Sequence, residues 1–215
     1  MNRDVALDHV ERIVETIESD EMPVPVREVW VYGDVALGLD PIDRLDVYLT
    51  KDMLMRGDRS RSAAFEERYG VKGVGSSVRA SWADAHPEFL RANDNGYAAP
   101  EKCLAAHLLN DVDSEIHLEV CNASFDDNVT QRLTGAVARD AYAEILDPRG
   151  VQLWVDGRRD EEAFTRLREG ELPFPTLSAA LEMLGLDPEE AEAASDAMRE
   201  YRASQTGTTV RGDVV

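Results

Sequence analysis

The chain has 215 residues, a formal net charge of −20, and only three lysines among its 23 basic residues. This composition argues against a broad basic surface for nucleic acid. It is typical of a protein from a cytoplasm of molar salt, where self-repulsion is screened. No stretch reaches the roughly 18 apolar residues of a membrane span, and the charged start does not resemble a signal peptide. We therefore expect a cytoplasmic protein with no membrane partner.

Hydrophobic periodicity predicts helices and strands in alternation along the chain. Helical patterns cover residues 4–19, 61–69, 82–91, 100–110, 125–146, 161–168, 176–184 and 188–202. Strand patterns cover residues 29–32, 45–50, 115–121 and 151–155. Residues 70–77 are rich in glycine and serine, which is typical of a loop or an edge-strand turn.

These patterns predict an α+β fold: a small mixed sheet with helices on one face, its other face open around Asp46. Residues 1–157 would form this domain, because the last strand pattern lies just before that boundary. Residues 158–204 would form a helical appendage that packs against the sheet domain. Residues 205–215 are polar and contain two glycines, so a disordered tail is predicted there.

The segment 29–49 is the part of the sequence that points to a function. A strand leads to Gly33, a residue type that readily adopts positive φ, and a short helical turn ends at Gly38. A turn-rich loop follows, and the next strand presents Asp46 on its polar face. An isolated acid at this position would be a solvated strand residue, but the preceding glycine turn favours a functional role.

This segment resembles the minimal nucleotidyltransferases of the polymerase-beta-like superfamily. Their pattern is a hydrophobic strand, Gly-Ser, a small helical turn ending in glycine, a loop, and Asp-x-Asp on the next strand. Gly33, Ala36 and Gly38 match the turn, and Asp46 matches the second acid of the pair. The resemblance therefore implies a nucleotide as the ligand and a metal-dependent transfer reaction.

Two positions depart from the family pattern. Asp34 stands where the family has serine, and Arg44 stands where it has the first metal-binding aspartate. Asp34 would repel a phosphate unless a metal ion lay between them, whereas Arg44 would repel a metal ion but could hold a phosphate. The loop is also one residue short, so Asp43 could take the role of the missing acid. These changes fit nucleotide binding without transfer at least as well as they fit catalysis.

A third acid of the family site comes from a strand beside the one that carries the Asp pair. The alternating pattern over 115–121 predicts a strand with Glu115, His117 and Glu119 on its polar face. Glu119, or Glu115, would then supply the third carboxylate. An antiparallel strand with one solvated face would give the same pattern, so both interpretations remain.

The resemblance implies Mg²⁺ as the cofactor, because divalent ions assist displacement at phosphorus and prefer carboxylate oxygens. The candidate catalytic and metal-binding residues are Asp46, Asp43 and Glu119. The candidate nucleotide-binding residues are Gly33, Asp34, Gly38, Arg44 and His117.

A structural zinc site is not expected, although the sequence contains two cysteine and histidine pairs. Cys103 and His107 could share one face of a helix. His117 and Cys121 lie on a predicted strand, where a rise of about 3.3 Å per residue would separate them by roughly 13 Å. Zinc ligands must lie about 2.0–2.3 Å from one ion, so we interpret both cysteines as buried thiols.

Three functions are compatible with the sequence. The first is a degenerate nucleotidyltransferase-like protein that binds a nucleotide or a protein partner without efficient transfer. The second is an active Mg²⁺-dependent nucleotidyltransferase that uses Asp34, Asp43, Asp46 and Glu119. The third is a non-enzymatic module that interacts with or regulates a partner. Arg44 favours the first and third over the second. The whole chain also resembles an uncharacterised family of extreme halophiles, which implies no particular activity.

Overall fold

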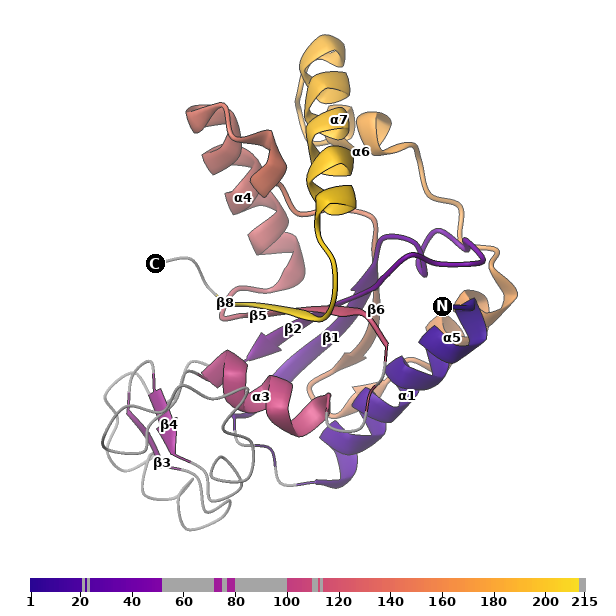
Figure 1. Cartoon of the computed structure of the whole chain (residues 1–215), viewed down its shortest axis with the longest axis vertical. Coiled ribbons are helices and arrows are strands. Elements are labelled where there is room, and N and C mark those ends of the chain that lie inside the picture. The colour runs from indigo at the N-terminus through magenta and orange to yellow at the C-terminus, as the bar shows by residue number, and fades with distance from the viewer. Residues whose placement is uncertain are drawn as a thin grey trace.

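The computed structural model shows a mixed sheet that lies between two groups of helices (Figure 1). It describes residues 1–20, 22, 24–51, 72–74, 77–79, 100–109, 112 and 114–212. The helices predicted over 61–69 and 82–91 lie outside these residues. The predicted α+β class and the mixed sheet are confirmed. None of the described helices is long and apolar enough to cross a membrane.

Six of the described strands form one sheet in the order β7-β6-β1-β2-β5-β8. Their bounds are β1 (Val26–Tyr32), β2 (Leu45–Lys51), β5 (Ile116–Cys121), β6 (Gly150–Val155), β7 (Arg158–Arg159) and β8 (Thr209–Gly212). β1 pairs antiparallel with β2 and β6, and β6 pairs antiparallel with β7. β2 pairs parallel with β5, and β5 pairs parallel with β8. β5 therefore lies directly beside the strand that carries Asp46.

A second, two-stranded sheet lies outside this arrangement. It consists of β3 (Lys72–Val74) and β4 (Ser77–Arg79), which pair antiparallel. Part of the glycine- and serine-rich run over 70–77 thus belongs to these two strands, in line with the edge-strand turn that the sequence suggests.

Most described helices follow the amphipathic patterns of the sequence within one or two residues at their ends. The helix predicted over 125–146 is shorter and ends at Arg139, because Asp140 takes a left-handed conformation and caps it. The described helices are α1 (Arg3–Ser19), α3 (Pro100–Leu108), α4 (Phe125–Arg139), α5 (Glu161–Glu169), α6 (Leu177–Met183) and α7 (Pro188–Ser204). A short 3-10 turn, η2 (Tyr142–Glu144), follows α4. Asp187 caps α7 by accepting a hydrogen bond from the Glu190 N–H, and Pro188 occupies the first turn, an arrangement that an Asp-Pro start favours.

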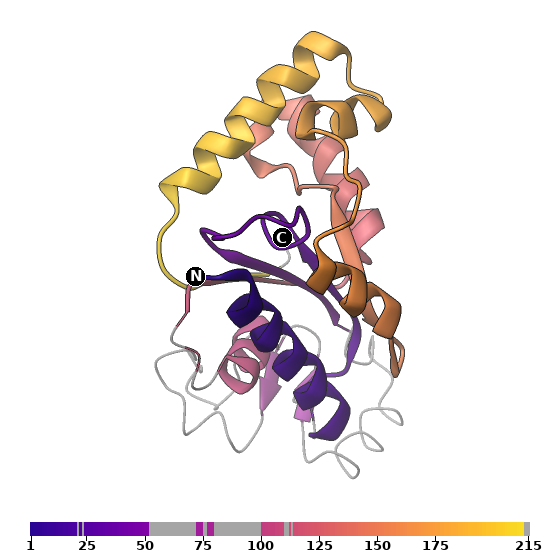
Figure 2. The same ribbon diagram turned by 90° about the vertical axis from the view of Figure 1, so that its right-hand side faces the viewer.

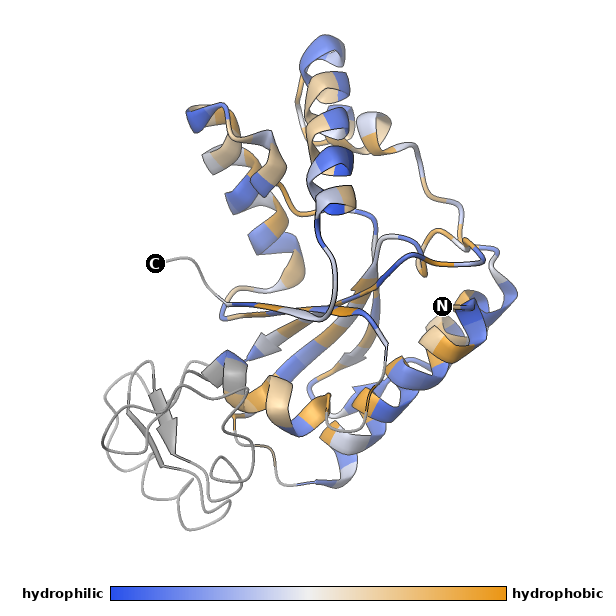
Figure 3. Ribbon diagram, viewed as in Figure 1, coloured by the Kyte–Doolittle hydropathy of each residue, from blue (hydrophilic) through white to orange (hydrophobic). Residues whose placement is uncertain are grey.

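One face of the sheet forms the main hydrophobic core. Alternate residues of β1, β2 and β5 point toward α1, α3 and α5, which cover this face (Figure 2). The core residues of the strands include Val29, Val31, Val47, Leu49 and Leu118. The orange stripe of α1 in Figure 3 turns toward the sheet, whereas its blue side faces away. This is the layout that burial of one helical face requires.

The other face of the sheet is covered as well. Phe125 at the start of α4 stacks on Trp30 with a ring distance of 4.7 Å and meets the edge of Tyr48 at 5.3 Å. α6 and α7 stand beside α4 (Figure 1) and share a second apolar cluster with it that includes Leu133, Leu181 and Ala194. The prediction that this face is open around Asp46 was therefore wrong: the Asp46 side chain is only 1% exposed.

The end of the chain differs from the predicted disordered tail. Within 205–215, residues 209–212 form β8 and extend the sheet beside β5. The four-residue segment Thr-Val-Arg-Gly is too short for its hydrophobic pattern to distinguish a strand from a loop. It forms a strand because its backbone pairs with β5. β5 is consequently an inner parallel strand with both faces buried, not an antiparallel strand with a solvated face.

Candidate functional site

The polar face of the sheet carries a row of buried hydrogen-bonding side chains on three adjacent strands. Tyr32 of β1 lies opposite Asp46 of β2, which in turn lies opposite His117 of β5. Glu119 is two residues further along β5 and shares this face because side chains alternate along a strand. Asp46, His117 and Glu119 are 1%, 6% and 3% exposed. The fold thus brings together three of the residues that the sequence singled out.

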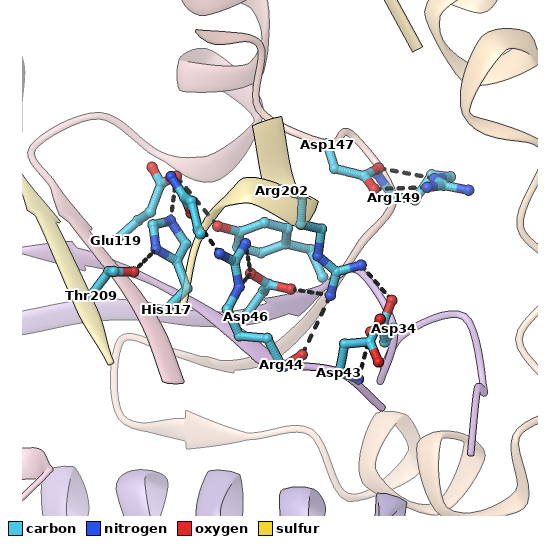
Figure 4. Close-up of polar contacts among 12 residues, drawn as sticks. Asp34, Asp43, Arg44, Asp46, His117, Glu119, Asp147, Arg149, Arg202 and Thr209 are labelled. Atoms are coloured by element: carbon cyan, nitrogen blue, oxygen red, sulfur yellow. Dashed lines mark hydrogen bonds and ion pairs between the residues drawn. The ribbon is translucent and has the colours of Figure 1, made fainter. Parts of the chain in front are cut away.

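Two arginines neutralise Asp46. Arg44 Nε donates to Asp46 Oδ1 at 2.8 Å, and Arg44 Nη2 lies 2.6 Å from the same oxygen. Arg202, at the end of α7, donates from Nη2 to Asp46 Oδ2 at 2.8 Å. Figure 4 shows that both oxygens of this carboxylate face guanidinium groups. Burial raises the pKa of Asp46, and Arg202 and Arg44 act against that shift.

Arg202 also connects Asp46 to the turn after β1. Its Nη1 forms an ion pair with Asp34 Oδ1, and Asp34 Oδ2 accepts a hydrogen bond from the backbone N–H of Asp43 at 3.0 Å. Burial of Arg202 would lower its pKa, but the carboxylates of Asp46 and Asp34 outweigh that effect and raise it. Asp34 therefore binds a positively charged group, which is the guanidinium of Arg202 and not a metal ion.

A second ion pair surrounds Glu119. Arg132 of α4 pairs with Glu119 Oε2, while His117 Nε2 lies 3.1 Å and Tyr32 Oη 3.3 Å from Oε1. Burial would raise the pKa of Glu119, but the hydrogen bond to His117 and the charge of Arg132 lower it to about 2. Because an ionised carboxylate only accepts hydrogen bonds, His117 must carry a proton on Nε2. Its Nδ1 bonds to Thr209 Oγ1 of β8 at 2.6 Å.

The predicted Mg²⁺ set does not fit this arrangement. Within the described residues, no three side chains of His, Cys, Asp or Glu lie close enough to share a metal ion. Asp43 is exposed and reaches the cluster through its backbone N–H. Asp46 and Glu119 bind guanidinium groups instead. Arginine thus neutralises these carboxylates where the family pattern would have a metal ion.

The glycines of the turn have a different role from the one predicted. Gly33 has φ +66°, and a Cβ atom there would lie 2.6 Å from Asp46 Oδ2. Gly38 has φ +72°, and a Cβ atom there would lie 3.0 Å from the Gly170 carbonyl oxygen. The Gly33 backbone thus makes room for the Asp46 carboxylate, and Gly38 makes room for the end of α5.

The two cysteine and histidine pairs lie on different elements: Cys103 and His107 on α3, and His117 and Cys121 on β5. Cys103 and Cys121 are both buried thiols, and burial raises the pKa of Cys103 to about 12. His107 Nε2 lies 3.6 Å from Asp20 Oδ2, while His117 is bonded to Glu119 and Thr209.

Two neighbouring pockets open beside the cluster. The first has a volume of about 100 Å³, and five arginines line it: Arg44, Arg149, Arg199, Arg202 and Arg211. The second, of about 400 Å³, shares Arg44, Arg199, Arg202 and Gln205 with the first and adds Asp43 and Glu115 to its lining. Arg149 is held by Asp147 through bonds of 2.9 and 2.8 Å. Arg211 forms no ion pair within the described part of the chain.

Residues 2–215 match a family of unknown function, DUF7095. The chain belongs to this family. No curated protein and no solved structure matches the chain. For this DUF7095 protein, the geometry of the site is therefore the basis for any functional argument.

Sequence reasoning missed several polar residues of the DUF7095 site, among them Arg132, Arg202, Gln205, Thr209, Arg211, Arg149 and Arg199. A signal existed for the first two. Arg132 lies seven residues after Phe125, and Arg202 lies four residues after Met198, so each falls on the buried stripe of its helix. An arginine at such a position indicates a buried acid as its partner. No comparable pattern marks Gln205, Thr209 or Arg211.

Proposed function

We propose that this protein binds a nucleotide, or a similar phosphorylated small molecule, through arginine side chains and does not catalyse efficient nucleotidyl transfer. The observation that carries the proposal is the lining of the first pocket. Five arginines meet there in a chain whose formal net charge is −20. Arginine is suited to phosphate because its planar fork presents several N–H donors to the oxygens.

The ion pairs of the site leave one positive charge without a partner. Asp34 and Asp46 balance Arg44 and Arg202, Asp147 balances Arg149, and Glu119 balances Arg132. Arg199 pairs with Asp196 at the surface. Arg211 has no such partner among the described residues. An anion beside Arg211 would therefore complete the charge balance of the pocket.

The sizes of the two pockets support a nucleotide as the ligand. The first, at about 100 Å³, suits a phosphate group better than a whole nucleotide. The second is about 400 Å³ and shares four lining residues with the first. We assign the phosphate to the arginine-lined pocket and the rest of the molecule to the larger one. Glu115 and Asp43 there can accept hydrogen bonds from hydroxyl or amino groups.

We propose the absence of transfer because the buried acids Asp46 and Glu119 are already paired with arginines. Phosphoryl and nucleotidyl transfer depend on metal ions that bridge the phosphates and neutralise developing charge. Arg44 holds one oxygen of Asp46 and Arg202 holds the other, so a metal ion would have to displace at least one of these arginines. Separating a buried ion pair is costly. These contacts favour binding over the alternative of an active Mg²⁺-dependent transferase.

Calorimetric titration tests the proposal. ATP is titrated into the protein in molar KCl, once with EDTA and once with Mg²⁺, because dilute buffer would leave the charge of −20 unscreened. We expect ATP to bind in EDTA, since arginine and not a metal ion holds the phosphates. Arg211→Gln should weaken binding by at least about tenfold, given that a charge-assisted hydrogen bond contributes about 1.5–3 kcal/mol.

Arg158→Gln is the matched control, because Arg158 is exposed on β7 and lines neither pocket. It should bind ATP as the wild type does. Failure of ATP, ADP and AMP to bind a folded sample would refute the proposal. Binding that occurs only with Mg²⁺ would favour the transferase, and product analysis would follow.

A further inference from the structure

The arginine-lined pocket draws its lining from several parts of the chain, and the segment after α7 is one of them. The sheet and its turns supply Arg44 and, beneath the pocket, Asp46. Gln205 and Arg211 come from residues 205–212, which we name the C-terminal strap. The strap leaves the end of α7 and crosses to the edge of the sheet beside β5 (Figure 1). The pocket is therefore complete only when the strap is docked.

Polar contacts hold the strap in place. Gln205 Oε1 accepts a hydrogen bond from Arg44 Nη1 at 2.6 Å. Thr208 Oγ1 donates to the Ser114 carbonyl oxygen at 3.2 Å, and Thr209 Oγ1 bonds to His117 Nδ1 at 2.6 Å. Each of these contacts joins the strap to a residue of the site or to the start of β5.

The apolar contribution of the strap is small. Val210 is its one partly buried hydrophobic residue that packs against the main core, and all four residues of β8 are only partly buried. Among the described strands, β8 lies at the edge of the sheet and has β5 as its one neighbour. Segments with few buried apolar contacts and exposed backbone hydrogen bonds open at low free energy. The strap has the features of such a segment.

Arg211 gives the docked strap an electrostatic cost. It lies opposite Glu119 in the β5–β8 register, but Glu119 is already paired with Arg132 and bonded to His117. Docking therefore adds a positive charge to the pocket that Arg44 and Arg202 line, and no acid among the described residues lies within ion-pair distance of it. An anionic ligand would remove this repulsion.

We propose that ligand binding and docking of the C-terminal strap are coupled, so that a phosphorylated ligand closes the strap over its own site. This inference rests on the proposed function. A ligand that binds the docked form and not the open form must stabilise docking, and docking must strengthen binding by the same factor. The fraction of molecules with the strap docked beside β5 would then increase when the ligand binds.

Hydrogen exchange tests the coupling. Amide exchange of residues 206–212 is compared by mass spectrometry without ATP and with ATP at a concentration that calorimetry shows to be saturating. At 100 times the dissociation constant, full coupling allows about a hundredfold slower exchange, and we expect at least a tenfold change. Amides of α5, which is remote from both pockets, provide the internal reference.

Thr209→Val provides an independent test, because Thr209 lines neither pocket and valine suits a strand. The variant loses the hydrogen bond to His117, so strap exchange should become faster and ATP binding weaker by a similar factor. Thr165→Val is the control, since Thr165 is exposed on α5 and bonds only to the Glu161 carbonyl of its own helix.

The outcomes separate the two proposals. ATP binding by calorimetry with unchanged strap exchange overturns the coupling and leaves the proposed function standing. Weaker docking in Thr209→Val with unchanged ATP affinity also overturns the coupling. If none of ATP, ADP and AMP binds the folded protein, both proposals fail together.

Discussion

The two faces of the central sheet are built from the same strands and differ in how they are stabilised. On one face, aliphatic side chains such as Val47 and Leu118 pack against α1, α3 and α5. On the other, Asp46 and Glu119 are buried just as deeply but are paired with arginines. The stability of the first face comes from burial of apolar area, which requires only that the side chains fit together in shape. The second depends on specific partners, because an unpaired buried charge is strongly unfavourable.

This difference leads to the largest expected effect, which is the loss of one acid from the polar face. Asp46→Asn leaves Arg44 and Arg202 with only Asp34 as a counter-charge. We expect the free energy of unfolding to fall by about 3–5 kcal/mol, the typical result of breaking a buried pair. Urea denaturation in molar KCl measures it.

The control is Asp196→Asn, which removes an exposed ion pair with Arg199 and should change stability by at most about 1 kcal/mol. Equal effects of the two substitutions would show that the buried arginines find other partners, and the contrast between the two faces would then weaken.

The matching change on the apolar face is Leu118→Ala, on the same strand as Glu119. Leu118 is fully buried, so we expect a loss of about 2–5 kcal/mol from the lost contacts and the cavity. The difference in free energy of unfolding between Leu118→Ala and the wild type should be the same at every salt concentration. Leu39→Ala, at an exposed site, should be close to neutral. A salt-dependent loss in Leu118→Ala would contradict the division between the faces.

Acid should affect the polar face through Glu119. Its folded pKa of about 2 lies below the ordinary value of 4.5. A lowered carboxyl pKa stabilises the fold above the unfolded pKa, and this contribution disappears as pH falls through the folded pKa. The shift corresponds to about 3 kcal/mol, lost between pH 4.5 and 2. Urea denaturation across this range should show a shallower pH dependence in Glu119→Gln than in wild type. Glu192→Gln, at an exposed site on α7, should keep the wild-type slope.

The smallest expected effect concerns the turn that makes room for Asp46. Gly33→Ala places a side chain at φ +66° and 2.6 Å from Asp46 Oδ2. Positive φ alone costs about 1–2 kcal/mol for alanine. Gly157→Ala has a similar φ of +84° but open space around its Cβ position. Thermal unfolding of both variants should show the larger loss for Gly33→Ala. If the two losses are equal, the contact between the turn and Asp46 has no energetic role.

The same contrast explains what the sequence could predict. Alternation along 45–50 and 115–121 correctly placed Asp46, His117 and Glu119 on one face of adjacent strands, because side-chain direction in a strand is a local property. Charge partners are not local. Arg202 lies 156 residues after Asp46, and no spacing rule connects them. The predicted Mg²⁺ site, the open sheet face and the disordered end all followed from missing these distant partners.

The separation between Arg202 and Asp46 also determines when the site can form during synthesis. Residues 26–51 and 116–155 contain the four inner strands of the sheet, and they leave the ribosome before α7 does. Until then Asp46 lacks one of its two arginines, and the edge of β5 lacks β8. Synthesis proceeds from the amino terminus at a finite rate. The nascent chain therefore passes through a stage in which the apolar core is available but the arginine-lined pocket is incomplete, because Arg202 and Arg211 are released only with the end of the chain.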